Sequence, residues 1–159
     1  MERKAIYPGT FDPITNGHVD LIKRALTVFD EVVVLVAHSG KKTPLLEAGV
    51  RKQLIEQCFD GNQKVRVEVY SGLLVEYARK NNIKVVLRGL RAVSDFEYEF
   101  QMSTMNRRMY PELQTFLLMA SEKFFFVNST LVKEVLSHGG DVSELVPAHV
   151  DKILREKLC

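Results

Sequence analysis

Hydrophobic and polar positions along the chain follow two different periods. Short apolar or alternating runs predict five β-strands, at residues 4–7, 31–37, 64–70, 83–89 and 114–120. Between these runs, apolar residues recur every three or four positions, and this spacing predicts helices. The first helix places Val19, Ile22, Leu26 and Phe29 on one face, and the others cover about 47–59, 71–82, 95–109, 129–137 and 147 onward.

The order of these elements indicates the fold. Strands that alternate with helices along a chain form a parallel sheet with helices on both faces. The run EVVVLVA at 31–37 is almost wholly apolar, as expected of a strand covered on both faces. KVRVEVY at 64–70 alternates instead, which favours a place near a sheet edge. The sequence therefore predicts an α/β fold with a doubly wound, five-stranded parallel sheet.

Length and composition fit one cytoplasmic domain over residues 1–159. Of the 159 residues, 46% are hydrophobic and 26% are charged, so the chain can bury one sizeable core. A net charge of +2 gives no support for nucleic acid or a membrane as a partner, and no apolar run could span a bilayer. The start of the chain lacks a secretory signal, and Cys58 and Cys159 lack metal-binding spacing, which favours a reducing cytoplasm.

Unusual residues gather where the predicted strands end. Ligands of parallel sheets bind beyond the carboxyl ends of the strands. After the first strand, the stretch YPGTFDPITNGH at 7–18 forms a turn in which Thr15 or Asn16 can cap the next helix and leave His18 in its first turn. Because helix N-termini bind anions, we expect His18 to lie beside a phosphate. The alternative is a solvated histidine in an ordinary capping turn.

Two arginines follow the fourth strand. Arg88 ends an apolar run and Arg91 comes three residues later. A guanidinium group matches phosphate oxygens in bidentate fashion, which favours a ligand. The alternative is an ion pair, Arg88–Asp95 or Arg91–Glu99, that only holds the following helix in place.

Two further loops add cations and hydroxyl groups at the same edge. Lys41 and Lys42 follow the second strand. Either both lysines are solvated surface residues, or one of them contacts a phosphate of the ligand. After the fifth strand, residues 128–130 read Asn-Ser-Thr directly before a helix, an N-cap suited to phosphate. The preceding triple Phe at 124–126 is expected in the core, with a wall for an aromatic base as the alternative.

Several motifs of other enzyme classes are missing. The chain has no GxxxxGK[ST] phosphate loop, no GxGxxG fingerprint and no GxSxG nucleophile turn. No pair of carboxylates stands out as acid and base. The candidate site offers cations and N–H donors without a nucleophile. Such a site is suited to stabilising charge on a phosphorus that a substrate oxygen attacks directly.

These stretches resemble a known enzyme family. Thr15-Asn16-Gly17-His18 is similar to the [HT]xGH signature of a nucleotidyltransferase superfamily, and NSTLVKE at 128–134 resembles its second signature. With LRGLRAVSDFEYE at 87–99, the resemblance narrows to the bacterial phosphopantetheine adenylyltransferases and covers essentially the whole chain. It implies a Rossmann-like nucleotidyltransferase fold.

The resemblance also implies a reaction. ATP and 4′-phosphopantetheine would give dephospho-coenzyme A and pyrophosphate, the penultimate step of coenzyme A biosynthesis. The acceptor phosphate would attack the α-phosphorus in line, without a covalent enzyme intermediate. The resemblance further implies Mg²⁺ on the ATP phosphates, held mainly by substrate oxygens and water with no protein metal site, a homohexamer, and inhibition by coenzyme A.

Roles for individual residues follow from the same resemblance. His18 would stabilise the transition state, and Lys42 and Arg88 would assist it as catalytic residues. The positions that match acceptor contacts are Thr10, Lys42, Leu74 and Arg88. The positions that match ATP contacts are Thr10, Phe11, His18, Gly89, Leu90, Arg91, Glu99, Phe124, Phe125, Phe126, Val127, Asn128, Ser129 and Thr130.

The chain departs from the family pattern in two places near the candidate site, and two other functions are open. Asn128 stands where a serine is usual, and the triple Phe at 124–126 replaces a stretch that contains Trp. One alternative is a sister nucleotidyltransferase that acts on nicotinamide mononucleotide or a cytidylyl acceptor. Another is a non-catalytic nucleotide-binding module, in which His18 would be dispensable.

Overall fold

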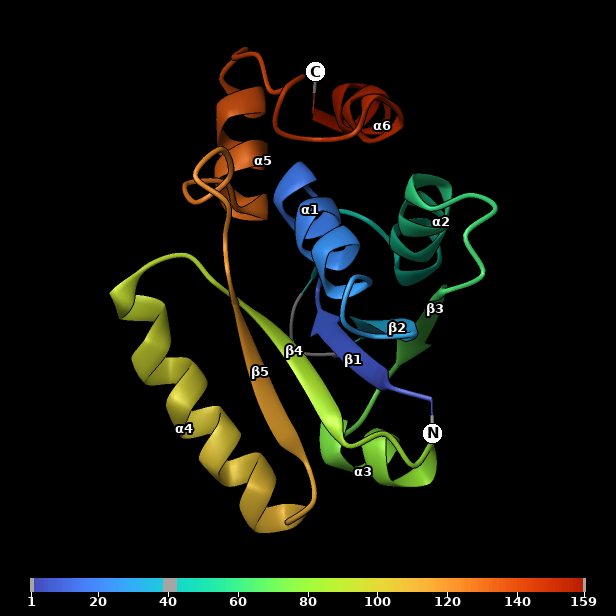
Figure 1. Cartoon of the computed structure of the whole chain (residues 1–159). Coiled ribbons are helices and arrows are strands. Elements are labelled where there is room, and N and C mark those ends of the chain that lie inside the picture. The colour runs from blue at the N-terminus through green and yellow to red at the C-terminus, as the bar shows by residue number, and fades with distance from the viewer. Residues whose placement is uncertain (1, 39–42, 159) are drawn as a thin grey trace.

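A five-stranded parallel sheet forms the centre of the molecule in the computed structural model, which describes residues 2–38 and 43–158. Its strands are β1 (Lys4–Gly9), β2 (Glu31–Ala37), β3 (Val65–Tyr70), β4 (Val85–Leu90) and β5 (Gln114–Met119). They lie in the order β3-β2-β1-β4-β5 (Figure 1), so β3 is an edge strand, as its alternating sequence predicts. Lys41, Lys42 and Cys159 lie outside the described residues.

Six helices connect and follow the strands in the described ranges. They are α1 (Asn16–Ala25), α2 (Ala48–Cys58), α3 (Leu74–Lys80), α4 (Val93–Met109), α5 (Ser129–Ser137) and α6 (Ala148–Leu158). Every predicted element is present, with bounds that shift by a few residues. None of the helices within residues 2–38 and 43–158 is both long and apolar enough to cross a membrane.

The sheet separates two apolar clusters because successive side chains of a strand point to opposite faces. Val32, Val34 and Val36 of β2 belong to the cluster that includes residues of α1, α2, α5 and α6. Val33 and Leu35 belong to the other cluster, with residues of α3. All five side chains are essentially inaccessible, which explains the nearly continuous apolar run at 31–37.

The strand order reverses between β1 and β4. These two strands are hydrogen-bonded neighbours, with Ile6 opposite Val86, although 75 residues lie between the end of β1 and the start of β4. From β1 the chain continues to β2 on one side, and from β4 it continues to β5 on the other. The connections diverge at this point, so the carboxyl ends of β1 and β4 leave room for a ligand.

Helix ends follow the capping residues of the sequence. Thr15 caps α1 and its side chain accepts a hydrogen bond from the His18 backbone N–H, and Asn128 caps α5 through Leu131 N–H. After α3, Asn82 has a φ of 52° and Ile83 N–H bonds back to Ala78 O at 2.9 Å. The chain therefore leaves α3 through a left-handed turn at Asn82.

Candidate functional site

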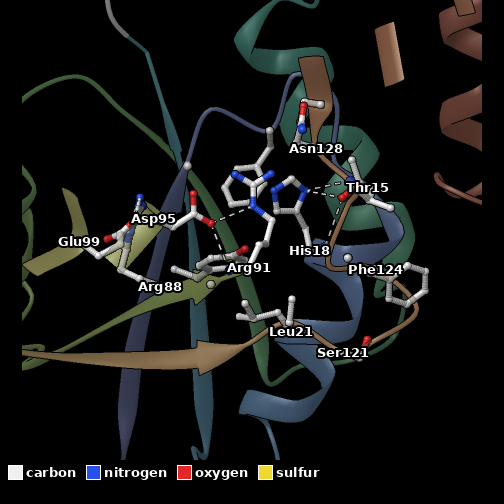
Figure 2. Close-up of a pocket in the computed structure, with 18 of the residues that line it drawn as sticks. Thr15, His18, Leu21, Arg88, Arg91, Asp95, Glu99, Ser121, Phe124 and Asn128 are labelled. Atoms are coloured by element: carbon white, nitrogen blue, oxygen red, sulfur yellow. Dashed lines mark hydrogen bonds and ion pairs between the residues drawn. The ribbon is translucent and has the colours of Figure 1, made fainter. Parts of the chain in front are cut away.

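A cavity of about 440 Å³, the central cavity, opens beyond the carboxyl ends of β1 and β4. Its walls come from those strand ends, the first turns of α1 and α4, and the segment that leads from β5 into α5 (Figure 2). The predicted site residues that line it are Phe11, His18, Arg88, Gly89, Arg91, Glu99, Phe124, Val127, Asn128 and Ser129. The imidazole and both guanidinium groups thus face one space, although His18 lies 70 or more positions before the two arginines in the chain.

His18 is held by the cap of its own helix. The backbone N–H of Thr15 donates to Nδ1 of His18 at 3.0 Å, and the His18 backbone N–H donates to Thr15 Oγ1 at 3.4 Å. This reciprocal arrangement is a capping box with histidine in the place of the usual Glu or Gln. Because a backbone N–H can only donate, Nδ1 must accept, and the neutral ring carries its proton on Nε2.

The surroundings of His18 favour this neutral form. Burial, and then the positive charges of Arg91 and Arg88, lower the pKa of the imidazole from 6.5 to about 4. At neutral pH the ring is therefore an uncharged hydrogen-bond donor through Nε2–H. A donor fixed in this way can stabilise negative charge without exchanging a proton.

Two aromatic rings fix the plane of the imidazole. Phe11 meets the ring of His18 edge-on, with 5.1 Å between centroids, and the ring of Tyr7 meets Phe11 at 5.4 Å. Phe11 is buried and has a φ of 50°, a left-handed conformation that is uncommon for a phenylalanine. Packing around His18 thus holds the turn between β1 and α1 in this uncommon conformation.

The two arginines pair with the helix acids, but with exchanged partners. Arg88 makes a bidentate ion pair with Glu99, at 2.8 Å from Nε to Oε2 and 2.7 Å from Nη2 to Oε1. Arg91 pairs with Asp95 at 3.4 Å. The predicted pairs Arg88–Asp95 and Arg91–Glu99 are therefore wrong. Arg88 lies inside β4 and reaches the second turn of α4, whereas Arg91 lies beyond the strand and reaches only the first.

Both arginines retain donors for a ligand. Three N–H groups of Arg88 bind Glu99 and the carbonyl of Pro8, and a guanidinium group carries five. Burial opposes the charge, but the hydrogen bonds that Arg88 donates to Glu99 and the charge of that carboxylate leave the pKa of Arg88 raised, so it stays charged. Arg91 is exposed and has only a long contact to Asp95, which leaves most of its fork available.

The floor of the central cavity is bare backbone at Gly89. A Cβ at this position would lie 2.8 Å from Leu21 Cδ1 of α1, closer than packed carbon atoms approach. The absence of a side chain at Gly89 therefore lets Leu21 of α1 pack closely against the backbone of β4.

A smaller space, the α4 cavity, shares a wall with the central cavity. It encloses about 140 Å³ and is lined by Pro8, Leu74, Val86, Arg88, Tyr98, Glu99, Met102, Ser103, Asn106 and Thr115. Leu74 and Arg88, two predicted acceptor contacts, meet here. The Arg88–Glu99 pair belongs to both cavities and forms the partition between them.

A third space, the loop cavity, lies on the other side of Ser129. It encloses about 440 Å³ and is lined by Thr10, Asp12, Ala37, Thr43, Pro44, Arg51, Ser129, Thr130 and Lys133. Thr10 and Thr130 line this space and not the central cavity. Lys42 lies outside the described residues, but Ala37 and Thr43 on either side of that gap line the loop cavity.

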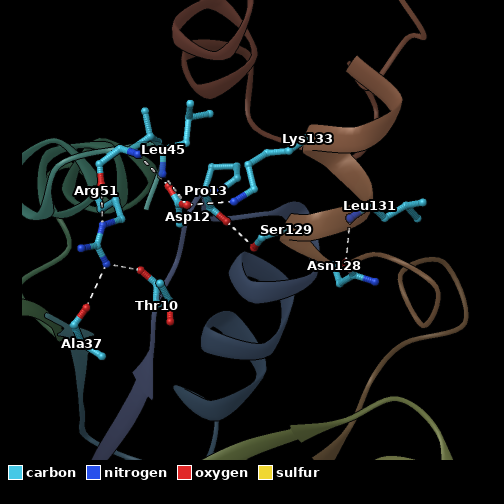
Figure 3. Close-up of polar contacts among 11 residues, drawn as sticks. Thr10, Asp12, Pro13, Ala37, Leu45, Arg51, Asn128, Ser129, Leu131 and Lys133 are labelled. Carbon is cyan, nitrogen blue, oxygen red and sulfur yellow. Dashed lines mark hydrogen bonds and ion pairs between the residues drawn. The ribbon is translucent and has the colours of Figure 1, made fainter. Parts of the chain in front are cut away.

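Three charged residues that sequence reasoning missed join the loops together (Figure 3). The carboxylate of Asp12 accepts from Leu45 and Leu46 N–H, both at 2.9 Å, and from Lys133 Nζ at 2.8 Å. The buried guanidinium of Arg51 donates to three carbonyls, of Thr10, Ala37 and Leu46, at 2.6, 3.0 and 2.9 Å. We call Asp12, Arg51 and Lys133 the loop clamp. A lone arginine on a helix gives no sequence signal for such a role.

The triple Phe divides between two environments. Phe124 packs against the main apolar cluster and lines the central cavity, and the Cβ that Gly17 lacks would lie 3.3 Å from it. Phe125 and Phe126 are 56% and 49% exposed, so their prediction as core residues is wrong. The loop after β5 turns back after Phe124 and directs both rings outward. With Leu90, they line none of these three cavities.

Within the described part of the chain, no three His, Cys, Asp or Glu side chains gather closely enough to hold a metal ion. The carboxylates that line the central cavity, Asp95 and Glu99, are paired with Arg91 and Arg88. The chemistry of the central cavity is therefore that of a donor-rich anion site with a fixed neutral imidazole.

Comparison with known proteins places this site in a family. Residues 6–135 match the model of the cytidylyltransferase-like family. A phosphopantetheine adenylyltransferase of Thermotoga neapolitana is 53% identical over 154 residues, 97% of this chain and 96% of that protein. Another, of Desulfotalea psychrophila, is 49% identical over 155 residues, 96% of this chain and 91% of that protein.

A solved structure shares the fold at low sequence identity. A protein of Vibrio parahaemolyticus assigned as a nicotinate-nucleotide adenylyltransferase superposes with a TM-score of 0.71 at 21% identity, covering 99% of this chain and 98% of that one. This likeness supports the Rossmann-like nucleotidyltransferase fold. Sequence similarity over nearly the full length is the finer criterion, and by it this chain belongs to the phosphopantetheine adenylyltransferase family of cytidylyltransferase-like proteins.

Proposed function

We propose that this protein transfers the adenylyl group of ATP to 4′-phosphopantetheine, giving dephospho-coenzyme A and pyrophosphate in coenzyme A biosynthesis. One observation carries the proposal. In a chain about half identical to phosphopantetheine adenylyltransferases, a neutral imidazole and two guanidinium groups face one cavity beyond the carboxyl ends of β1 and β4. That arrangement suits the charge that develops when one phosphate attacks another.

The transfer needs no nucleophile or base from the protein. An oxygen of the acceptor phosphate forms the new bond to the α-phosphorus of ATP, and the bond from that phosphorus to the oxygen shared with the β-phosphate breaks. Pyrophosphate leaves with the electron pair. The acceptor phosphate is largely ionised at neutral pH, with a second pKa of about 6, so no general base is required. Nε2–H of His18 donates to the oxygens whose charge increases.

The three cavities suggest how the two substrates divide the site. ATP would occupy the central cavity, against Phe11, His18, Gly89 and Arg91 and the stretch from Phe124 to Thr130, with Leu90 and Glu99 in support. The acceptor would lie toward Leu74 and Arg88, with Thr10 and Lys42 near its phosphate. The α4 cavity supports this division because it joins Leu74 to Arg88 directly beside the central cavity.

Magnesium would arrive with ATP. The cavity carboxylates are already paired with arginines, and this donor set fits an ion held mainly by phosphate oxygens and water. When bound, such an ion neutralises part of the charge on the phosphates. Arg88 and Arg91 supply the remaining positive charge from the protein side.

We further propose that the chain acts as one domain in a cytoplasmic homohexamer inhibited by coenzyme A. Self-association is supported by α4, which exposes apolar residues on its outer side. Phe96, Phe100 and Met105 are 45%, 59% and 52% exposed, an unusual density for a monomer surface. Neither nucleic acid nor a membrane is needed as a partner.

The direct test is pyrophosphate release from ATP and Mg²⁺ with 4′-phosphopantetheine as acceptor. We expect release that depends on this acceptor and dephospho-coenzyme A as the product. Nicotinamide mononucleotide, and CTP with a phosphoalcohol acceptor, serve as controls for the sister enzymes. Release with one of these acceptors but none with 4′-phosphopantetheine would overturn the proposal.

Substitution of His18 distinguishes between an enzyme and a non-catalytic nucleotide-binding module. We expect His18→Ala to retain ATP affinity but to lose about a hundredfold or more in kcat, because its donor acts mainly on the transition state. The variant also removes half of the capping box. His18→Gln is the matched control, since Gln at this helix position can restore the cap but has no imidazole.

The two variants should therefore differ in thermal stability and agree in lost turnover. Calorimetric ATP binding and steady-state kinetics measure the two effects separately. Wild-type turnover in His18→Ala would show that the imidazole has no part in the reaction.

A further inference from the structure

We infer that Tyr7 is a further catalytic residue, whose hydroxyl group donates a hydrogen bond to a non-bridging oxygen of the α-phosphate during transfer. The inference rests on the proposed function. It concerns a residue of β1 that the sequence marks only as part of an apolar strand.

The side chain of Tyr7 is buried in the wall of the central cavity. It is 6% exposed, it lines the cavity beside His18, Arg88 and Arg91, and its ring packs edge-on against Phe11. Residues 5 and 7 of β1 point to the face covered by α1, which places this phenol on the same side of the sheet as the imidazole.

The hydroxyl group is short of partners. Within the described ranges, it makes no hydrogen bond to a protein atom, whereas the comparable hydroxyl of Tyr77 donates to Glu68 at 2.7 Å. Hydroxyl groups in folded proteins usually have a partner, which can be a protein atom, water or a ligand. Because this oxygen is not sealed from the cavity, a ligand there can accept its hydrogen bond.

The position of the oxygen indicates which ligand group it meets. It lies 3.9 Å from the point where a Cβ on Gly89 would stand, so it reaches from β1 toward the backbone of β4 at the cavity floor. The centroids of the Tyr7 and His18 rings are 6.2 Å apart, and Arg88 and Arg91 both act on the hydroxyl electrostatically. A group that meets all four side chains is small and anionic, as is the transferred phosphate.

The hydroxyl group stays protonated in this setting. Burial raises the pKa of Tyr7 far above its ordinary value, and the opposing effects of Arg88 and Arg91 are smaller. The phenol therefore acts only as a donor, and its proton stays on Tyr7 throughout the reaction.

Tyr7→Phe removes the hydroxyl and keeps the ring that supports Phe11 and His18. We expect kcat to fall about 10- to 100-fold, with the KM of both substrates within about threefold of wild type, since hydrogen bonds to charged groups are among the stronger ones. Tyr77→Phe is the matched control. That tyrosine is equally buried but lies in the opposite apolar cluster, so its variant should lose stability and keep wild-type kcat.

The contact atom is tested with the two diastereomers of ATPαS, in which sulfur replaces one non-bridging α-oxygen. Sulfur is a poor acceptor, so the wild-type enzyme should discriminate against the diastereomer with sulfur toward Tyr7. Tyr7→Phe should reduce that discrimination. An equal ratio in both enzymes would overturn the assignment to the α-phosphate.

Three other results would also overturn it. If Tyr7→Phe changes the NMR titration of His18, the residue acts through the imidazole and touches no substrate. If wild-type enzyme is active and Tyr7→Phe has wild-type kcat, this inference fails alone. If the wild-type enzyme releases no pyrophosphate, the proposed function fails and the inference fails with it.

Discussion

Local structure determines the tautomer and the protonation state of the His18 imidazole. Its Nδ1 is committed to the Thr15 backbone N–H, and the cavity wall keeps the ring uncharged. Because the folded pKa lies below the ordinary value of 6.5, the unfolded chain binds a proton here before the folded chain does. Protonation of His18 therefore reduces stability as the pH falls from about 6.5 to about 4.

We expect His18 to remain neutral throughout the pH range in which the enzyme works. The NMR signal of its ring, assigned by its loss in His18→Gln, should show no titration step near pH 6.5. The pH profile of kcat/KM should likewise lack a limb from this residue near pH 6.5, because the Nε2–H donor is present on both sides of it. A titration of the ring at that pH would contradict the neutral donor.

Single residues were predictable only where they belong to a motif. The helix cap at Thr15 and the place of His18 followed from the order Thr-Asn-Gly-His before an apolar helix. Tyr7 and Arg51 carry no such signal, because a strand tyrosine and a helix arginine are usually core and surface residues. What distinguishes Tyr7 and Arg51 is the position of the polar group at the end of each side chain. That position depends on packing between elements that are distant in the sequence.

At the scale of elements, the loop clamp fixes how three connections meet. Asp12 comes from the β1–α1 turn and Lys133 from α5, while Leu45, Leu46 and Arg51 come from the segment between β2 and β3. Burial alone would raise the pKa of Asp12, but Lys133 and the two backbone N–H groups lower it overall. The carboxylate is therefore ionised at neutral pH and stabilises the fold in that form.

Replacing this carboxylate should have a pH-dependent cost. We expect Asp12→Asn to lose about 2 kcal/mol or more of unfolding free energy at pH 7, because it leaves Lys133 and a backbone N–H without their acceptor. The loss of unfolding free energy relative to wild type should have its full size above about pH 5. It should shrink as the pH falls below 3.8, the ordinary pKa of an aspartate side chain. Urea denaturation between about pH 3 and 7 measures it.

The control for this experiment is Asp60→Asn, which alters an exposed carboxylate. It should leave stability within about 0.5 kcal/mol of wild type. A loss for Asp12→Asn that stays the same down to pH 3 would mean that ionisation of Asp12 does not contribute.

The helices and strands were largely predictable from the sequence, but the ion pairs between them were not. Apolar runs gave all five strands, and the alternation at 64–70 placed β3 correctly at an edge. The pairing of Arg88 with Glu99 depends on how deep in β4 the arginine lies and how far α4 extends along the sheet. Spacing in the sequence could not separate it from the pairing with Asp95.

At the scale of the whole molecule, α4 is built the opposite way from an ordinary surface helix. It buries Glu99 and Asn106, while Val93, Phe100 and Met105 are exposed. The neighbouring edge strand β5 exposes Phe116 and Met119 as well. An unpaired edge beside an apolar helix is a surface that a second copy of the chain can cover.

We expect charges on this surface to lower the oligomeric state. Phe100→Glu and Met105→Glu place carboxylates outside all three cavities, so they should leave the fold of the subunit intact. Light scattering after size exclusion should show a smaller mass for the double variant than for wild type. Val28→Glu, at an exposed apolar position in the connection between α1 and β2, is the matched control and should keep the wild-type mass. An unchanged mass for the double variant would place the interface elsewhere.

The missing side chain at Gly89 has a consequence for how this enzyme can change. A single methyl group there would meet the end of the Leu21 side chain, which would have to turn aside within the lining of the central cavity. The space beside the imidazole would then change shape, although His18 itself had not been altered. A substitution at a position that lacks a side chain can therefore reshape the site through a neighbouring residue.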